Sequence, residues 1–171
     1  MTHADEPAEG GSGVSHTRER LVAITLDERS ISQANANVVH EREVAIYDIL
    51  DQNMFAIEGR DDGPFTLDLS IVEDRLVFTV GTPQTTETLT FMLALSALRR
   101  IIRDYFSVCD TYYQAIRTAP PSRIQTIDMG RRALHDEGSQ VLIERLKGKI
   151  ALDHATARRL FTLICALHWK G

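Results

Sequence analysis

The segment FTLDLSIV, residues 65–72, carries the clearest structural signal in this sequence. Apolar and polar residues alternate along it one by one, which is the pattern of a β-strand with one buried face. A turn at Glu73-Asp74 leads into RLVFTV, residues 75–80, which repeats the alternation, and a third strand is expected over residues 86–94. The three segments predict a small antiparallel β-sheet, a meander with one face in solvent.

The regions on either side of the meander are mostly helical. Upstream, LVAITL (residues 21–26) predicts a further strand, and apolar spacing predicts a helix over residues 38–53. Downstream, helices are expected over residues 96–118, over residues 121–147 with a possible interruption at Gly138, and from a cap at Asp153 onward. We therefore expect one α+β domain over residues 21–171, with about four helices packed on the sheet and an all-helical C-terminal half. Residues 1–20 are polar and Gly-rich and are expected to form a disordered N-terminal tail.

Composition excludes several classes of protein. With 171 residues, 43% hydrophobic and 25% charged, the chain is neither a collagen, a coiled-coil rod, a disordered acidic tail nor a disulfide-stapled toxin. No apolar run approaches the roughly 20 residues that cross a bilayer, and residues 1–20 lack the hydrophobic centre of a secretory signal. We expect a cytoplasmic protein. Its two cysteines, Cys109 and Cys165, lie in apolar helical patterns and are expected to be buried free thiols.

Charge is distributed unevenly along the chain, although the formal net charge is only -5. Residues 1–96 carry 6 basic and 17 acidic side chains, whereas residues 97–171 carry 13 and 7. We favour the interpretation that the acidic half folds onto the basic helical half and neutralises it. The alternative is that the basic half attracts phosphates or an acidic partner.

The segment IDMGRRALHDEGSQVLIERL, residues 127–146, places two glycines on one stripe of a helix. At 100° per residue, Gly130 and Gly138 share that stripe with Ile127, Leu134 and Val141. Glycine inside a helix costs about 0.5–1 kcal/mol relative to alanine. We expect another element to cross closely over both glycines, with a ligand at the backbone as the alternative.

Beside this stripe the same helix gathers polar side chains that could carry chemistry. Asp128, Arg132, His135 and Ser139 fall within about 60° of one another, and Arg131 lies closer to the apolar stripe. An acid, a histidine and two guanidinium groups suit a phosphate or carboxylate site with an acid–base residue. The alternative is a set of structural salt bridges with a partly buried histidine.

Two further arginines are candidate ligand-binding residues. Arg99 faces Arg103 at i,i+4, a repulsive spacing unless an anion or an acidic residue lies between them. The protein's own N-terminal carboxylates are the expected anions, and a shared anionic ligand is the alternative. RNA is the least expected partner, because the aromatic residues that would stack on bases lie on apolar stripes.

Other site types have no support in the sequence. The histidines lack the spacing of a metal motif, and there is no Gly-rich phosphate loop, GxSxG elbow or dinucleotide fingerprint, so we expect neither a metal nor a cofactor. Met129 projects opposite the apolar stripe of its helix. It predicts either a helix covered on both sides or an exposed contact for a homo-oligomer.

Four runs carry a family resemblance: HEREVAIYDIL, LRRIIRDYFSVCDTYYQAIR, IDMGRRALHDEG and TARRLFTLICALH. Together they resemble the uncharacterised family of small bacterial proteins numbered 0262, over about residues 21–169. The resemblance implies a bacterial cytosolic setting and a single domain. It implies no activity, cofactor or catalytic residue.

These features favour a cytoplasmic binding or regulatory module over an enzyme. Its Arg-rich helical face would take an acidic protein partner or a small anionic ligand. No membrane is involved, and nucleic acid is the less expected partner. The alternative is a small enzyme acting on a phosphorylated or carboxylated metabolite. In that enzyme Asp128 would orient His135 as the acid–base group, while Arg131 or Arg132 would hold the anion.

Overall fold

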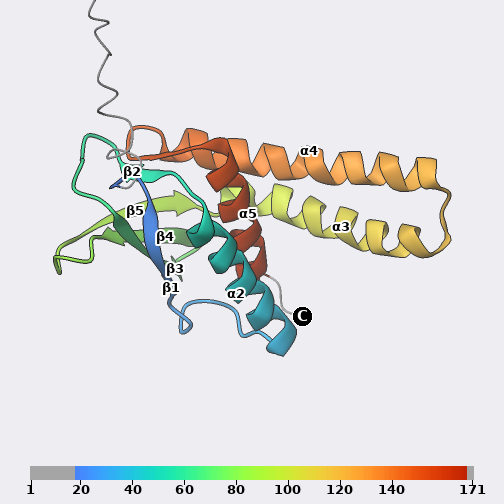
Figure 1. Cartoon of the computed structure of the whole chain (residues 1–171). Coiled ribbons are helices and arrows are strands. Elements are labelled where there is room, and N and C mark those ends of the chain that lie inside the picture. The colour runs from blue at the N-terminus through green and yellow to red at the C-terminus, as the bar shows by residue number, and fades with distance from the viewer. Residues whose placement is uncertain (1–17, 169–171) are drawn as a thin grey trace, which may run out of the picture.

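The computed structural model describes residues 18–168 and has the predicted α+β architecture (Figure 1). In chain order its elements are β1 (Leu21–Leu26), α2 (Ala36–Asp51), β2 (Phe55–Ile57), β3 (Phe65–Val72), β4 (Arg75–Gly81), β5 (Thr88–Ala94), α3 (Ser96–Thr118), α4 (Pro121–Leu146), β6 (Ile150–Leu152) and α5 (His154–His168).

The four-stranded sheet has the order β1-β3-β4-β5, and its β3-β4-β5 part is the predicted antiparallel meander. Glu73 and Asp74, both at positive φ, make the tight turn between β3 and β4. The additional strand β1 pairs with β3 in parallel, so the four-stranded sheet as a whole is mixed. Helix α2 lies between β1 and β3 in the chain, so the backbone returns to the same end of the sheet before β3 begins.

A second, two-stranded sheet joins distant parts of the chain. β2 pairs antiparallel with β6, and Phe55 is paired with Leu152. The C-terminal half is therefore helical apart from one three-residue strand. A strand of that length shows too little alternation to be predicted from sequence.

The core lies between one face of the large sheet and the helices α2 and α5 (Figure 1). The Asp153 carboxylate caps α5 as predicted, accepting a hydrogen bond from the Thr156 backbone N–H at 2.8 Å. α5 is buried over most of its circumference, and its Phe161 ring is fully enclosed. Burial of this helix supplies much of the apolar contact that holds the domain together.

Helices α3 and α4 form an antiparallel pair that extends well beyond the sheet (Figure 1). Its outer part, residues 107–130, is called the arm below. α4 runs through Gly138 without interruption. Ile116 lies in the arm and is 48% exposed, because within residues 18–168 the arm has only two helices to bury it.

The buried face of α4 is rotated from the predicted one. It centres on Gly138 and Leu142, so Gly130 faces solvent and a Cβ there would meet nothing within 4 Å. The expected close crossing is confirmed at Gly138, where a Cβ would lie 2.2 Å from Phe161 Cε2. Met129 is 65% exposed, so it is not buried within one chain. The two glycines therefore have separate roles, although helical spacing places them on one stripe.

The cysteines are free thiols. Cys165 is buried as expected, whereas Cys109 is half-buried. Burial raises the pKa of both thiols, so both stay protonated at neutral pH.

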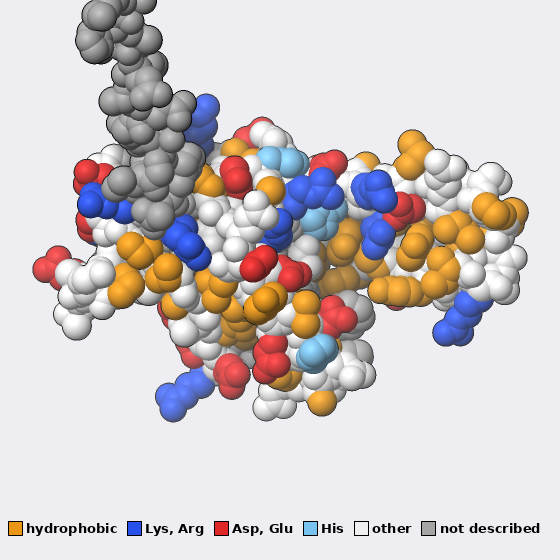
Figure 2. Space-filling view, in the orientation of Figure 1, with side chains coloured by type: hydrophobic (Ala, Val, Ile, Leu, Met, Phe, Trp, Pro, Cys, Tyr) orange, Lys and Arg blue, Asp and Glu red, His pale blue; other side chains and the backbone are white. Residues whose placement is uncertain are grey.

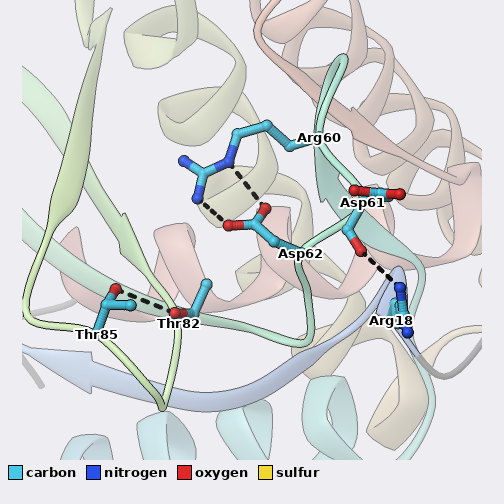
Figure 3. A network of polar contacts seen from close by, with 6 residues as sticks. All are labelled: Arg18, Arg60, Asp61, Asp62, Thr82 and Thr85. Carbon is cyan, nitrogen blue, oxygen red and sulfur yellow. Dashed lines mark hydrogen bonds and ion pairs between the residues drawn. The ribbon is translucent and has the colours of Figure 1, made fainter.

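Most of the predicted tail, residues 1–17, lies outside the described residues. Residues 18–20 are described, and the Arg20 carbonyl accepts a hydrogen bond from the Phe65 N–H at 2.8 Å. Figure 3 shows the loop that flanks this segment, where the Arg18 guanidinium donates to the Asp61 carbonyl and Arg60 pairs with Asp62. A Cβ on Gly63 would lie 1.8 Å from the Arg18 carbonyl oxygen, so only glycine allows this contact. Packing against the domain therefore begins before Leu21.

Candidate functional site

A cavity of about 320 Å³ opens where α3, α4 and α5 meet at the base of the arm. It is lined by Tyr105, Arg131, Arg132, His135 and Arg158, and is called the arginine cavity below. Figure 2 shows basic and histidine side chains gathered over this junction. The structure thus brings together three of the residues singled out in the sequence and adds Tyr105 and Arg158.

The close packing of α5 on α4 builds this cavity. The Phe161 ring lies against Gly138, where no side chain keeps the two helices apart. His135 lies one turn before Gly138, and Arg158 lies one turn before Phe161, so the same contact brings these two side chains to one opening. Tyr105 closes the α3 side, with its ring 5.8 Å from that of Phe161.

Arg131 and Arg132 are held by the Asp128 carboxylate. Asp128 accepts from Arg131 Nη2 at 2.6 Å and lies 3.0 Å from Arg132 Nε. Hydrogen bonding from Arg131 lowers the pKa of Asp128, so the carboxylate stays ionised. The Arg131 guanidinium also lies over the Tyr112 ring, 4.7 Å from its centroid. Arg131 is therefore pre-positioned, whereas the Arg132 side chain is 71% exposed.

His135 does not pair with Asp128 within the described residues, so the arrangement that the enzyme alternative would need is not formed there. His135 Nε2 instead lies 2.8 Å from Thr162 Oγ1, and the Thr162 hydroxyl donates to the Arg158 carbonyl. Because that hydroxyl has used its proton, the hydrogen-bond network assigns Nε2 as the donor. His135 Nδ1 is then a buried acceptor without a partner in the described residues.

The pKa of His135 predicts a pH dependence of stability. Burial is the main cause that lowers the pKa of His135 below 6.5, and the positive charge of Arg158 is the next. Arg131 and His154 lower this pKa further, whereas the carboxylate of Asp136 raises it. The unfolded chain binds this proton more readily, so the free energy of unfolding should fall as pH drops from about 6.5 through the lowered folded value. Denaturant titrations over this pH range should show that the free energy of unfolding falls less steeply in His135→Gln than in wild type. The exposed His40→Gln variant is the control, and equal slopes in all three proteins would contradict the prediction.

Three other predicted residues lie outside the arginine cavity. Ser139 is fully buried and donates to the His135 carbonyl at 2.7 Å, so its hydroxyl satisfies the backbone of its own helix. Arg99 and Arg103 line a separate, mostly apolar cavity of about 330 Å³. Arg99 forms an ion pair with Asp74 there, as expected for a carboxylate of the acidic half.

Neutralisation between the two halves of the chain is otherwise limited. Of the nine ion pairs within residues 18–168, only the Arg99–Asp74 pair joins residues 1–96 to residues 97–171. The basic side chains of α4 and α5 pair with carboxylates of their own half, such as Arg158 with Asp136 at 3.0 Å. The favoured interpretation, that the acidic half neutralises the basic half, is therefore not supported by direct pairing.

Sequence reasoning missed Arg158, Tyr105 and Thr162 as parts of this site. Arg158 and Arg159 are adjacent in the sequence, but their side chains diverge, and Arg159 donates to the Gln52 carbonyl. Tyr105 lies on an apolar stripe of α3, a position that by itself indicates only a core side chain. Only the three-helix packing reveals that these side chains meet, and no local spacing signals it.

Residues 18–168 contain neither a cluster of metal ligands nor a helix fit to span a membrane. No three histidine, cysteine or acidic side chains gather as metal ligands there. Within the same residues, every helix is too short or too polar to cross a membrane.

Comparison with known proteins supports the resemblance noted in the sequence. The profile of the Uncharacterised protein family (UPF0262) matches residues 18–170. A UPF0262 protein of Rhodopseudomonas palustris (strain BisB5) is 55% identical over 155 residues, covering 91% of this chain and 95% of its own. One of Nitrobacter winogradskyi is 54% identical, covering 91% and 93%, and one of Bradyrhizobium sp. is 56% identical, covering 89% and 91%. No solved structure matches the chain. The chain therefore belongs to the Uncharacterised protein family UPF0262.

Proposed function

We propose that this protein is a cytoplasmic binding module whose arginine cavity holds a small phosphate- or carboxylate-bearing molecule. The observation that carries the proposal is the meeting of three guanidinium groups, from Arg131, Arg132 and Arg158, at one opening. Arginine presents a planar fork of donors that matches two oxygens of a phosphate or carboxylate. Positively charged guanidinium groups at one cavity repel one another. A bound anion offsets that repulsion.

The charge around the cavity favours an anion. Three guanidinium groups face the carboxylates of Asp128 and Asp136, which leaves one positive charge unmatched locally. The lowered pKa of His135 keeps its ring neutral at pH 7, so it adds no charge. Arg132 and Arg158 are 71% and 43% exposed and can turn toward a ligand, while Arg131 stays fixed by Asp128.

The size of the cavity limits the ligand. A volume of about 320 Å³ is at the lower end of the range for small-molecule sites, roughly 300–1,000 Å³. A compact metabolite, or one acidic group of a protein partner, fits this space better than a dinucleotide. The acidic protein partner remains a form of the same proposal, because it would present the same carboxylate or phosphate to the same arginines.

An enzyme is the second candidate, and it rests on the fact that His135 and Arg131 line the same cavity. Acid–base catalysis needs a ring nitrogen within reach of the substrate. His135 Nε2 is engaged by Thr162 and Nδ1 is buried, so both nitrogens are withheld in this conformation. Binding therefore accounts for more of the geometry than turnover does.

The test is a thermal-shift screen of the protein with phosphate, pyrophosphate, citrate and a set of phosphorylated and carboxylated metabolites. At 100 times its dissociation constant a ligand adds about 2.7 kcal/mol, which corresponds to a shift of about 5–10 °C for a domain of this size. We expect the shift to disappear in Arg132→Gln/Arg158→Gln, whose altered side chains are the most exposed of the three.

The matched control is Arg99→Gln/Arg103→Gln, which removes two arginines from the other cavity and should keep the shift. A shift that survives in Arg132→Gln/Arg158→Gln would overturn the proposed site. Silence across the whole panel would exclude a small ligand of these classes. Turnover of a shifting metabolite, lost in His135→Gln, would favour the enzyme.

A further inference from the structure

α3 carries two apolar stripes. Only the first stripe is in contact with other elements along the whole length of the helix. The first stripe contacts α4, with the Tyr105 ring 5.7 Å from that of His135 and the Tyr112 ring beneath Arg131. The second stripe repeats at alternating spacings of four and three residues, as in a helix with a partner helix. It comprises Ile102, Phe106, Cys109, Tyr113 and Ile116.

Burial along the second stripe decreases toward the arm. Ile102 is buried, Phe106 and Cys109 are half-buried, and Tyr113 and Ile116 are 58% and 48% exposed. The arm extends away from the sheet in Figure 1, and Figure 2 shows apolar side chains gathered along it. The second stripe therefore continues onto a surface that no other described helix or strand covers.

The exposed end of the second stripe, Tyr113 and Ile116, is called the α3 surface below. Two side chains of opposite charge border it. Asp110 and Arg117 are seven residues apart, two helical turns, so they lie on the same side of α3. Together with Tyr113, Gln114 and Thr118 they line an open cavity of about 440 Å³. Neither forms an ion pair within residues 18–168.

We propose that the α3 surface binds a second copy of the chain, with α3 antiparallel to α3 of that copy. When the twofold axis passes between Tyr113 and Gln114, each Asp110 lies opposite Arg117 of the other copy, giving two reciprocal ion pairs. Between the two ion pairs, Tyr113 and Ile116 of both copies make apolar contacts. The surface is self-complementary in charge, as an isologous dimer requires. The proposal is independent of the arginine cavity.

The arm makes such a dimer sterically possible. It projects past the sheet and α5 (Figure 1). We therefore expect a second arm to lie alongside it without meeting the body of the first copy. The paired α3 helices bury Tyr113 and Ile116, two apolar side chains that one arm leaves in water.

Charge reversal tests the pairing, with sedimentation equilibrium as the measurement. Wild type should have twice the monomer mass of 19.2 kDa. Asp110→Arg and Arg117→Asp should each weaken the dimer by about tenfold or more, because each replaces two attractive pairs with two repulsive ones. The double variant Asp110→Arg/Arg117→Asp should regain the dimer, and so should an equal mixture of the two single variants.

The control is Met129→Ser, which changes the exposed methionine on α4 and should leave the dimer unchanged. A monomeric wild type would overturn the proposal. Failure of both the double variant and the mixture to recover would also overturn it, as would loss of the dimer in Met129→Ser. Circular dichroism should show that each variant is folded, because Asp110, Arg117 and Met129 are all exposed.

Discussion

Replacing Gly138 by alanine should lower the free energy of unfolding by about 1–3 kcal/mol, although alanine is the better helix former. The added Cβ would lie 2.2 Å from Phe161 Cε2 and 2.5 Å from two other atoms of the same ring. Phe161 is fully buried and cannot swing away. The two helices must therefore separate, and the loss of packing outweighs the gain in helix propensity.

Gly130 is the matched control, because it lies in the same helix in open space. Gly130→Ala should raise the free energy of unfolding by about 0.5–1 kcal/mol, through helix propensity alone. Urea titrations of the two variants should thus shift in opposite directions from wild type. Equal stabilisation by both would show that α5 does not lie directly on Gly138.

Replacing Arg42 by methionine should lower the free energy of unfolding by about 2–4 kcal/mol. Arg42 is 8% exposed, and its guanidinium donates to the carbonyls of Ala166, Leu167 and Ser32 at 3.0–3.3 Å. The first two belong to the last turn of α5, whose carbonyls have no helical partner and carry the negative end of the helix dipole. Methionine keeps the volume but leaves these oxygens buried and unpaired.

Arg123→Met provides the comparison, because Arg123 is exposed on α4. It should change the free energy of unfolding by less than about 0.5 kcal/mol. Chemical denaturation of both variants measures the difference. Similar losses in both would mean that Arg42 does not hold the end of α5.

The sequence predicted best those elements that depend on local signals, such as alternation along a strand or a helix cap. The β3–β4 hairpin followed from one-by-one alternation around Glu73-Asp74, and the α5 start followed from the Asp153 cap. The parallel partner of β1 could not be predicted in the same way, because strand pairing across α2 is non-local. The buried face of α4 was misplaced for a related reason. Apolar residues occur around much of that helix, and α5, not the spacing, selects the face.

In the candidate site, too, residues of one helix could be predicted from the sequence, whereas residues from other helices could not. Arg131, Arg132 and His135 were grouped correctly because neighbours on one helix follow from its geometry. Arg158 and Tyr105 come from other helices, so only tertiary packing brings them in. Asp128 was placed beside the histidine by spacing, but two arginines compete for its carboxylate at closer range.

Anomalous scattering from crystals grown with selenate would show whether Arg131, Arg132 and Arg158 form one anion site. Selenate has the shape and charge of sulfate, and the anomalous signal of its selenium gives its position without ambiguity. We expect a selenium peak inside the arginine cavity, within hydrogen-bond reach of at least two of the three guanidinium groups. An empty arginine cavity, with selenate bound instead at Arg99 and Arg103 or nowhere, would mean that the three arginines do not form an anion site.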